Sequence, residues 1–74
     1  MTGTVAVIGA GSWGTALAYL LAKKGNKVKL WVYLEEERKS LEENRENISF
    51  LPGVALSKNI EFSCDMEYCI KDTL

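Results

Sequence analysis

A chain of 74 residues has room for one small domain, and its 47% hydrophobic content predicts a folded rather than a disordered one. Nine basic and ten acidic residues leave a net charge of −1, which gives no electrostatic case for nucleic acid or an anionic membrane as the partner. No apolar run approaches the roughly 20 residues that cross a bilayer, and the lack of histidine excludes imidazole as an acid, a base or a metal ligand.

The first predicted element is a strand over residues 4–8, TVAVI, which is apolar on both alternating faces as a central parallel strand requires. A glycine-rich turn follows, and the spacing of apolar residues then predicts a helix over 12–24 that ends at Gly25. The face of this helix that is expected to meet the core consists of Trp13, Leu17, Leu20 and Leu21, with Ala16 beside them.

A second strand is expected over residues 27–33, KVKLWVY, where apolar residues alternate with lysines and aromatic residues. Strand, helix and strand over about thirty residues make a βαβ unit, whose crossover is right-handed in about 98% of cases. The next stretch, LEEERKSLEENREN over residues 34–47, predicts a solvated, highly charged helix. Its thin apolar seam consists of Leu34, Leu41 and Ile48.

The segment Phe50 to Gly53 ends that helix, because proline disfavours helical geometry before it and glycine permits a turn after it. A third strand with one buried side is expected over residues 59–64, and Asp65 can cap a final helix that runs to Leu74. Together these elements predict the α/β fold class: a Rossmann-type parallel sheet with flanking helices, with only the first βαβαβ portion present.

The predicted sheet lacks one strand of the usual arrangement. In the doubly wound order 3-2-1-4 the first strand is central and a fourth lies beside it. Residues 4–8 would therefore keep an unpaired edge, which natural domains avoid. We expect residues 1–74 to be the N-terminal part of a dinucleotide-binding domain of a longer protein, and the isolated chain to self-associate through residues 4–8. A compact 74-residue variant is the alternative.

The two cysteines are interpreted as small core residues. Cys64 and Cys69 have a spacing that fits neither a CxxC redox pair nor a zinc knuckle. The first residues also lack the basic region of a signal peptide. These features predict a cytoplasmic protein with reduced thiols and no metal site.

The sequence GAGSWG over residues 9–14 matches the GxGxxG pattern, and it lies between a strand and a helix, the context in which this pattern binds a dinucleotide. Gly9 permits the sharp turn, Gly11 lets the backbone approach the phosphates, and Gly14 lets the helix lie close to the strand. The amides at the helix start, with the helix dipole behind them, favour an anionic pyrophosphate. A purely structural turn is the alternative.

The end of the second strand bears on the choice between NAD and NADP. Tyr33 stands near the place where an acid commonly holds the ribose of NAD, or an arginine the 2′-phosphate of NADP. Glu35 comes one or two positions late for the first role. The acidic cluster over residues 35–37 would repel a 2′-phosphate, although Arg38 is close in sequence. The residues therefore favour NAD over NADP.

Two longer stretches carry a resemblance to a known family: VAVIGAGSWGTALAYLLAKKGNKVKLW over residues 5–31 and ENISFLPG over residues 46–53. They resemble the start of bacterial-type NAD(P)-dependent glycerol-3-phosphate dehydrogenase, and the resemblance extends to the closing NIEFSCDMEYCIKD. The continuation GSWGTALA and the Asn-x-x-(Phe/Tyr)-Leu-Pro-Gly segment are far more specific than the three glycines. Family members are several times longer, so the resemblance implies that the helical substrate domain is absent from this chain.

The resemblance also implies which residues contact the cofactor. Ser12 and Trp13 match the pair that contacts the dinucleotide, and Phe50 matches an aromatic residue close to it. Tyr33 matches a position that is often basic in the family, which leaves the preference for NAD or NADP open. The structural alternatives are a core position for Trp13 and loop anchoring for Phe50. Trp31 is assigned to packing.

By the same resemblance, the full-length enzyme reduces dihydroxyacetone phosphate to glycerol 3-phosphate, a precursor of glycerophospholipids, with NADH or NADPH. Hydride passes to the carbonyl carbon while a lysine acts as general acid at the oxygen. That lysine lies in the later part of family sequences, so no catalytic residue is expected here, and Lys29 and its neighbours are interpreted as solvent-facing charges. The full-length enzyme is expected to be a homodimer that binds neither nucleic acid nor membrane.

Three other functions remain open from the residues alone. A non-catalytic dinucleotide-binding or regulatory module would share the glycine turn. A flavin-binding domain would also share it, but such a domain carries a glutamate at the end of the second strand, where this chain has Tyr33 and Leu34. An inactive truncated fragment would bind cofactor poorly and associate through its bare strand edge.

Overall fold

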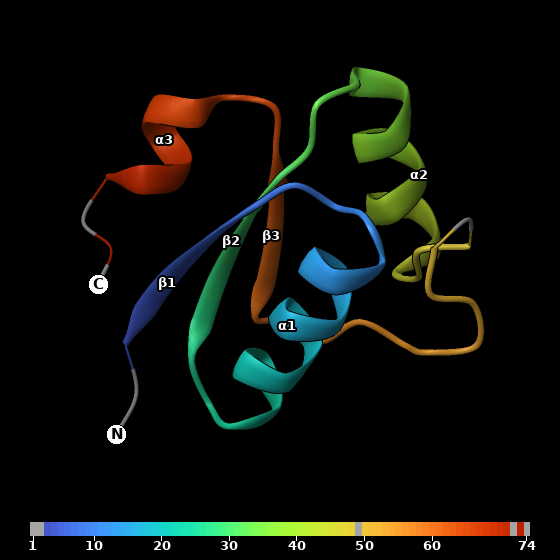
Figure 1. Ribbon diagram of the computed structural model, residues 1–74, viewed down its shortest axis with the longest axis horizontal. Helices are drawn as coiled ribbons and strands as arrows, with labels where there is room; N and C mark the ends of the chain where they lie inside the picture. Colours follow the sequence, from blue (N-terminus) through green and yellow to red (C-terminus); the bar gives the residue numbers. More distant parts are fainter. Residues whose placement is uncertain (1–2, 49, 72, 74) are drawn as a thin grey trace.

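The computed structural model describes residues 3–48, 50–71 and 73, and its helices and strands form an α/β architecture (Figure 1). The elements are, in chain order, β1 (Thr4–Ile8), α1 (Ser12–Lys23), β2 (Lys27–Trp31), α2 (Glu35–Asn44), β3 (Ile60–Ser63) and α3 (Met66–Ile70). The three strands are parallel and lie in the order β1-β2-β3, with β2 in the centre. This confirms the predicted Rossmann-type sheet, including the 3-2-1 part of its strand order.

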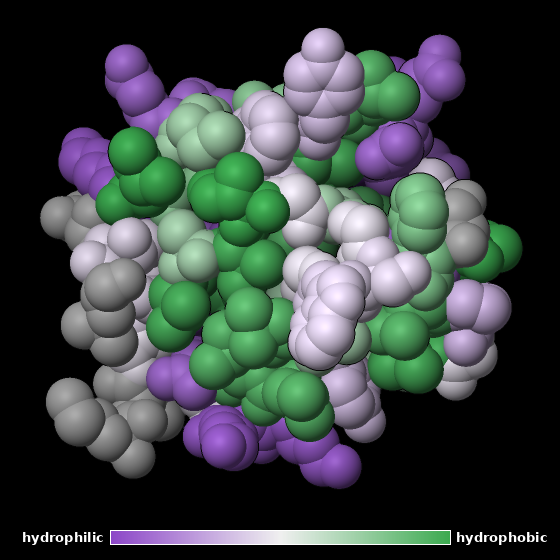
Figure 2. All heavy atoms as spheres, in the orientation of Figure 1, coloured by the Kyte–Doolittle hydropathy of each residue, from purple (hydrophilic) through white to green (hydrophobic). Residues whose placement is uncertain are grey.

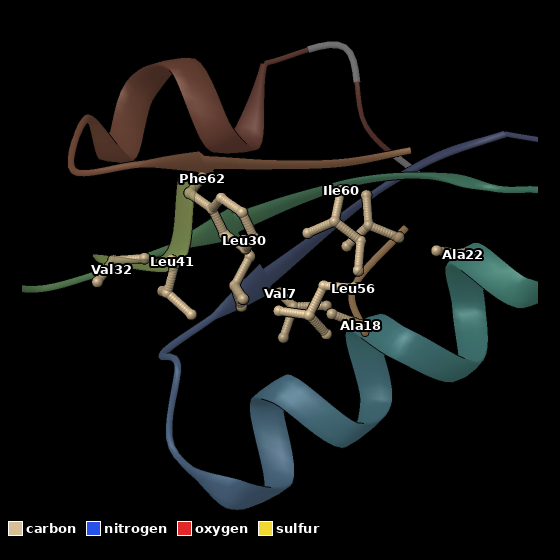
Figure 3. Close-up of a cluster of buried hydrophobic side chains, with 10 residues drawn as sticks. Val7, Ala18, Ala22, Leu30, Val32, Leu41, Leu56, Ile60 and Phe62 are labelled. Atoms are coloured by element: carbon tan, nitrogen blue, oxygen red, sulfur yellow. The ribbon is translucent and has the colours of Figure 1, made fainter. Parts of the chain in front are cut away.

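The hydrophobic core lies between the sheet and α1 (Figure 3). Its members are Val7, Ala18, Ala22, Val28, Leu30, Val32, Leu41, Leu56, Ile60 and Phe62. Leu41 belongs to α2, so α1 and α2 cover the same face of the sheet. In Figure 3, α3 lies on the opposite face, where it buries Cys69. The predicted alternation is confirmed, since Val28, Leu30 and Val32 are buried, but the strand ends at Trp31 and not at residue 33 as predicted.

The buried face of α1 differs from the one that its apolar spacing predicted. Thr15, Ala18 and Ala22 meet the sheet, and of the predicted residues Leu21 packs partly buried against the core, whereas Trp13 is 89% exposed. Leu17 and Leu20 are also about half exposed, at 48% and 53%. The reason is the tight turn before the helix, which brings α1 so close to β1 that only small side chains fit between them. Size, not hydrophobicity alone, therefore decides which face of α1 is buried.

The charged helix is shorter than its sequence predicted, and its apolar seam is reduced to Leu41. The chain leaves the helix at Arg45, which has a left-handed φ of 50° and donates its amide to the Leu41 carbonyl. Leu34 and Ile48 lie beyond the two ends of α2 and are 48% and 56% exposed. Glu35 is the first residue of α2.

The final helix begins where its cap was predicted and ends early. The Asp65 side chain accepts a hydrogen bond from the Tyr68 amide at 3.2 Å, which confirms it as the N-cap. The helix stops at Ile70, and the predicted continuation includes residues 72 and 74, which lie outside the described residues. The sequence context predicted that Lys29 faces solvent, but the structure places its ammonium group at the end of α3. Its Nζ donates to the carbonyls of Tyr68 and Lys71, both at 3.1 Å, and so satisfies the end of α3.

The first strand is less buried than a central strand. Val7 is 6% exposed, as expected, but Ile8 is 50% exposed, so the prediction that both faces of residues 4–8 are covered was wrong at this end. Within the described residues β1 pairs with β2 alone and forms an edge of the sheet. Both cysteines are free, Cys69 fully buried and Cys64 half-buried, and loss of hydration raises the pKa of both thiols.

Candidate dinucleotide site

The turn between β1 and α1 depends on glycine at its first position. Gly9 has a φ of +102°, a backbone conformation that side chains disfavour. Its amide donates to the Trp31 carbonyl at 3.0 Å, so the turn starts directly from the last ladder bond between β1 and β2. The role predicted for Gly9, to permit a sharp turn, agrees with this geometry.

Gly14 is required for a different reason, the close approach of two backbones. A Cβ built on Gly14 would lie 1.9 Å from the carbonyl oxygen of Gly9 and 3.6 Å from Cγ1 of Val7. No side chain can occupy that space. The predicted role of Gly14, to let the helix lie close to the strand, agrees with this geometry.

The first turn of α1 presents backbone amides without protein acceptors. The first helical hydrogen bond runs from the Thr15 amide to the Gly11 carbonyl at 2.9 Å, and within the described residues no acceptor faces the amides of residues 11–14. The first turn carries no acidic side chain, and a Cβ at Gly11 would meet no atom within 4 Å. Unpaired N–H groups, a positive helix end and open space together can hold a pyrophosphate.

The carbonyl of Ala10, in the middle of the turn, points away from this space. It accepts hydrogen bonds from Oγ1 of Thr15 at 3.1 Å and from Nδ2 of Asn47 at 2.7 Å. Both donors are buried: Thr15 is fully buried, and Asn47 is 7% exposed. The sequence placed Asn47 in a specific motif but did not include it among the site residues. Its partners are too distant in sequence for spacing to reveal them.

Ser12 and Phe50, two predicted cofactor residues, lie together in the structure. The Ser12 hydroxyl donates to the Phe50 carbonyl at 3.1 Å, while the Phe50 amide donates to Oδ1 of Asn47 at 3.2 Å. The backbone of Phe50 is therefore anchored on both sides, and its ring remains half exposed. The backbone of Phe50 thus anchors the loop, while its ring stays accessible to a ligand. Ser49 of the same motif lies outside the described residues.

The other two aromatic residues of the predicted site are exposed. Trp13 stands in the first turn of α1 with 89% of its surface free, so the alternative of a core position was wrong. Tyr33 follows β2 with 76% of its surface free, and its ring lies edge-on to Trp31 with centroids 5.9 Å apart. Trp31 itself is half-buried and donates its indole N–H to the Cys64 carbonyl at 3.0 Å, in keeping with its assignment to packing.

A pocket of about 190 Å³ opens beside the glycine turn. Ala10, Asn47 and Phe50 form the wall next to the turn. The carboxylate side chains that line it, Glu36, Glu37 and Glu46, give it a negative potential.

The nearest arginine does not offset that charge. Arg38 pairs with Glu35 and, at 2.7 Å, with Glu42. The hydrogen bond from Arg38 holds the pKa of the Glu35 carboxyl below its usual range, and the same pairs raise the pKa of Arg38. The guanidinium is thus already engaged by two carboxylates.

Neither a cluster of metal ligands nor a membrane-spanning helix is found in the described part of the chain. No group of three or more cysteine and carboxylate side chains there could hold a metal ion. None of its helices has the length and apolar character to cross a bilayer.

Residues 4–74 match the family model described as "NAD-dependent glycerol-3-phosphate dehydrogenase N-terminus". The chain belongs to this family. The resemblance stated from its motifs is thereby confirmed, and the Rossmann-type topology is the one shared by solved structures of glycerol-3-phosphate dehydrogenases.

Curated relatives agree over most of the chain. It is 53% identical over 66 residues to glycerol-3-phosphate dehydrogenase [NAD(P)+] of Citrifermentans bemidjiense, a match that covers 89% of this chain and 20% of the relative. The corresponding protein of Pelotomaculum thermopropionicum is 51% identical over 90% of this chain and 19% of its own length. The chain therefore spans about a fifth of the curated relatives that it matches.

Solved structures give the same result in three dimensions. Glycerol-3-phosphate dehydrogenase from Coxiella burnetii superposes with a TM-score of 0.90 at 35% identity, covering 97% of this chain and 22% of that one. The enzyme from Saccharomyces cerevisiae superposes with a TM-score of 0.85 at 28% identity, covering 99% of this chain and 24% of that one. The fold of these enzymes is therefore shared by nearly the whole of this chain.

Proposed function

We propose that residues 9–14 bind the pyrophosphate of NAD or NADP. The observation that carries the proposal is the row of unpaired amides over residues 11–14, which faces open space at the positive end of α1. The residues that we assign to the site are Gly9, Gly11, Ser12, Trp13, Gly14, Tyr33 and Phe50. The exposed aromatic rings among them offer apolar surface to the adenine or nicotinamide rings on either side of the phosphates.

Titration of the natural gene product with NADH and NADPH tests this proposal. The amides of residues 11–14 and the open space that they face are called the cradle below. We expect saturable quenching of tryptophan fluorescence and a calorimetric signal, because Trp13 lies beside this cradle in the first turn of α1. ADP-ribose, which keeps the pyrophosphate and lacks the nicotinamide, should compete. Absence of any response to both coenzymes would overturn the assignment. FAD serves as the comparison for the flavin alternative, and tighter binding of FAD than of NADH would favour that alternative.

We further propose that the site prefers NAD to NADP. A 2′-phosphate needs a free cation, but Arg38 is already paired with Glu35 and Glu42, and Tyr33 carries no charge. The carboxylates that line the neighbouring pocket would repel the additional phosphate. NADH should therefore bind more tightly than NADPH.

The variant Glu35→Gln tests the preference directly. It removes one of the two carboxylates that engage Arg38, so NADPH affinity should rise relative to that of NADH. Glu43→Gln, on the same helix and outside these ion pairs, is the matched control and should leave the ratio unchanged. Tighter binding of NADPH than of NADH by the unmodified protein contradicts the proposal.

For the whole protein we propose the activity named in its relatives, the reduction of dihydroxyacetone phosphate to glycerol 3-phosphate with NAD(P)H. Residues 1–74 then supply the N-terminal part of the cofactor domain, and the chain alone lacks the residues for the chemical step. When bound, the nicotinamide would supply a hydride, and the amides of residues 11–14 would hold the pyrophosphate of the same coenzyme. We propose a cytoplasmic homodimer as its working form.

A coupled experiment separates this activity from a non-catalytic module. The natural gene product should oxidise NADH when dihydroxyacetone phosphate is added, measured as loss of absorbance at the reduced nicotinamide band. Binding of NADH without turnover would favour a regulatory or truncated form. Sedimentation of the same preparation would show whether the protein is a dimer.

A further inference from the structure

A single buried side chain, Asn47, connects the glycine turn with the segment that carries Phe50. Its Nδ2 donates to the Ala10 carbonyl at 2.7 Å and to Oγ1 of Thr15 at 2.8 Å. Its Oδ1 accepts the Phe50 amide at 3.2 Å. Both donors and the acceptor of the Asn47 amide group are therefore occupied by the two segments that form the proposed site.

Thr15 completes the arrangement from the other side. Its Oγ1 accepts from Asn47 and donates its own proton to the Ala10 carbonyl at 3.1 Å. Thr15 is fully buried and lies on the face of α1 that meets the sheet. The Ala10 carbonyl is thus held by two buried donors, and neither donor can rotate away into solvent.

The position of this carbonyl determines the direction of the next amide. In a trans peptide the C=O and the following N–H point in opposite directions, because the peptide unit is planar. With the Ala10 oxygen held toward Asn47 and Thr15, the amide of Gly11 points to the other side, and no acceptor in the described residues pairs with it. Rotation of the same peptide would bring a carbonyl oxygen toward the phosphates and would oppose their binding.

We infer that Asn47 is a positioning residue for the pyrophosphate: it sets the Ala10–Gly11 peptide so that the Gly11 N–H faces the cradle. This inference rests on the proposed dinucleotide function. Asn47 does not touch the ligand in this arrangement; it acts through the Ala10 carbonyl and, by its bond to the Phe50 amide, fixes the second segment against the first.

The variant Asn47→Asp tests the inference. Aspartate keeps the size and the acceptor for the Phe50 amide, but it places a carboxylate oxygen, instead of an N–H donor, against the Ala10 carbonyl. We expect affinity for ADP-ribose to fall about five- to tenfold, the effect of losing hydrogen bonds of ordinary net strength. Affinity for adenosine, which has no phosphate, should stay unchanged in an NMR titration.

Two further variants separate positioning from charge and from general loss of structure. Thr15→Val is close to isosteric and adds no charge, and it should also weaken ADP-ribose relative to adenosine. Asn44→Asp adds the same charge to α2 at a side chain whose hydrogen bonds, within the described residues, go to Ser40, and it should change neither affinity. Equal loss of both ligands in Asn47→Asp, or unchanged ADP-ribose affinity, would overturn the inference. Failure of the unmodified protein to bind ADP-ribose would instead overturn the proposed function on which it rests.

Discussion

At the residue scale, two glycines of the turn have opposite requirements. Gly14 has no room for a methyl group, since its Cβ would lie 1.9 Å from the Gly9 oxygen. Gly11 has room within the protein and an ordinary φ of −72°, so any penalty for a side chain there comes from the ligand. The same residue type therefore serves packing at one position and, in the proposed site, binding at the other.

This contrast predicts different outcomes for two alanine variants. Gly14→Ala should lower the free energy of unfolding by about 3 kcal/mol, at the upper end of overpacking effects. Gly11→Ala should leave the unfolding free energy nearly unchanged but weaken NADH binding, because the methyl group occupies the cradle. Denaturant titration and NADH titration of both variants make the comparison. Equal stability of the two variants would contradict the close approach at Gly14.

Trp13 offers a second prediction at this scale. Because its side chain is 89% exposed, Trp13→Ala should change the unfolding free energy by no more than about 0.5 kcal/mol, as for other surface positions. NADH affinity should fall, since a large apolar surface beside the cradle is removed. Leu20→Ala, which truncates another exposed apolar side chain of α1 in its second half, is the control and should bind NADH normally. A marked loss of stability in Trp13→Ala would restore the core interpretation.

At the scale of the elements, α3 is connected to the sheet by a tyrosine as well as by Lys29. The Tyr68 hydroxyl donates to Oε2 of Glu61 at 2.5 Å, and this hydrogen bond raises the pKa of Tyr68. The raised pKa means that the folded state favours the neutral phenol. The link therefore contributes stability below the pKa of the unfolded tyrosine and loses it as pH rises through the folded value.

Titration of tyrosine absorbance checks this link. In Glu61→Gln the pKa of Tyr68 should move down from its value in the unmodified protein, because the accepting carboxylate is gone. Tyr68→Phe identifies which step of the titration belongs to this residue. An unchanged Tyr68 titration in Glu61→Gln would mean that the hydrogen bond is absent in solution.

The elements also show which parts of the structure the sequence could predict. Strand alternation and glycine spacing were sufficient for β1, α1, β2 and the turn between them, because these signals are local. The buried face of α1 was mispredicted because both of its faces are apolar, and the choice between them depends on how closely Gly14 lets the helix approach. The roles of Asn47 and Lys29 were not recognised because their partners in the glycine turn, α1 and α3 are 32 to 42 residues away.

At the scale of the whole molecule, one edge of β1 has no partner strand in the described residues. Gly9 donates to Trp31 and Lys27 donates to Gly3, so the odd-numbered residues of β1 bond to β2. The even-numbered residues turn their N–H and C=O groups outward, where no strand pairs with them in the described chain. The face seen in Figure 2 also carries a broad hydrophobic area in the region of β1 and α1.

We predict that the isolated 74-residue chain self-associates through β1, because unpaired strand edges pair with one another. Ala6→Pro removes an outward N–H without removing a bond to β2, so it should shift the chain toward monomer in sedimentation. Val7→Pro removes a bond to β2 and is the matched control, which should unfold instead. A stable monomer of the unmodified chain at high concentration contradicts the prediction.

The bond between Asn47 and Ala10 has a consequence for biosynthesis. The glycine turn leaves the ribosome 37 residues ahead of the asparagine that orients its central peptide. A nascent chain that has released only β1, α1 and β2 therefore has the complete GxGxxG sequence, but its Ala10 carbonyl has only one of its two donors, Thr15. Under the role proposed for Asn47, such a chain is expected to bind coenzyme more weakly until Asn47 has emerged, even though every glycine of the motif is already free.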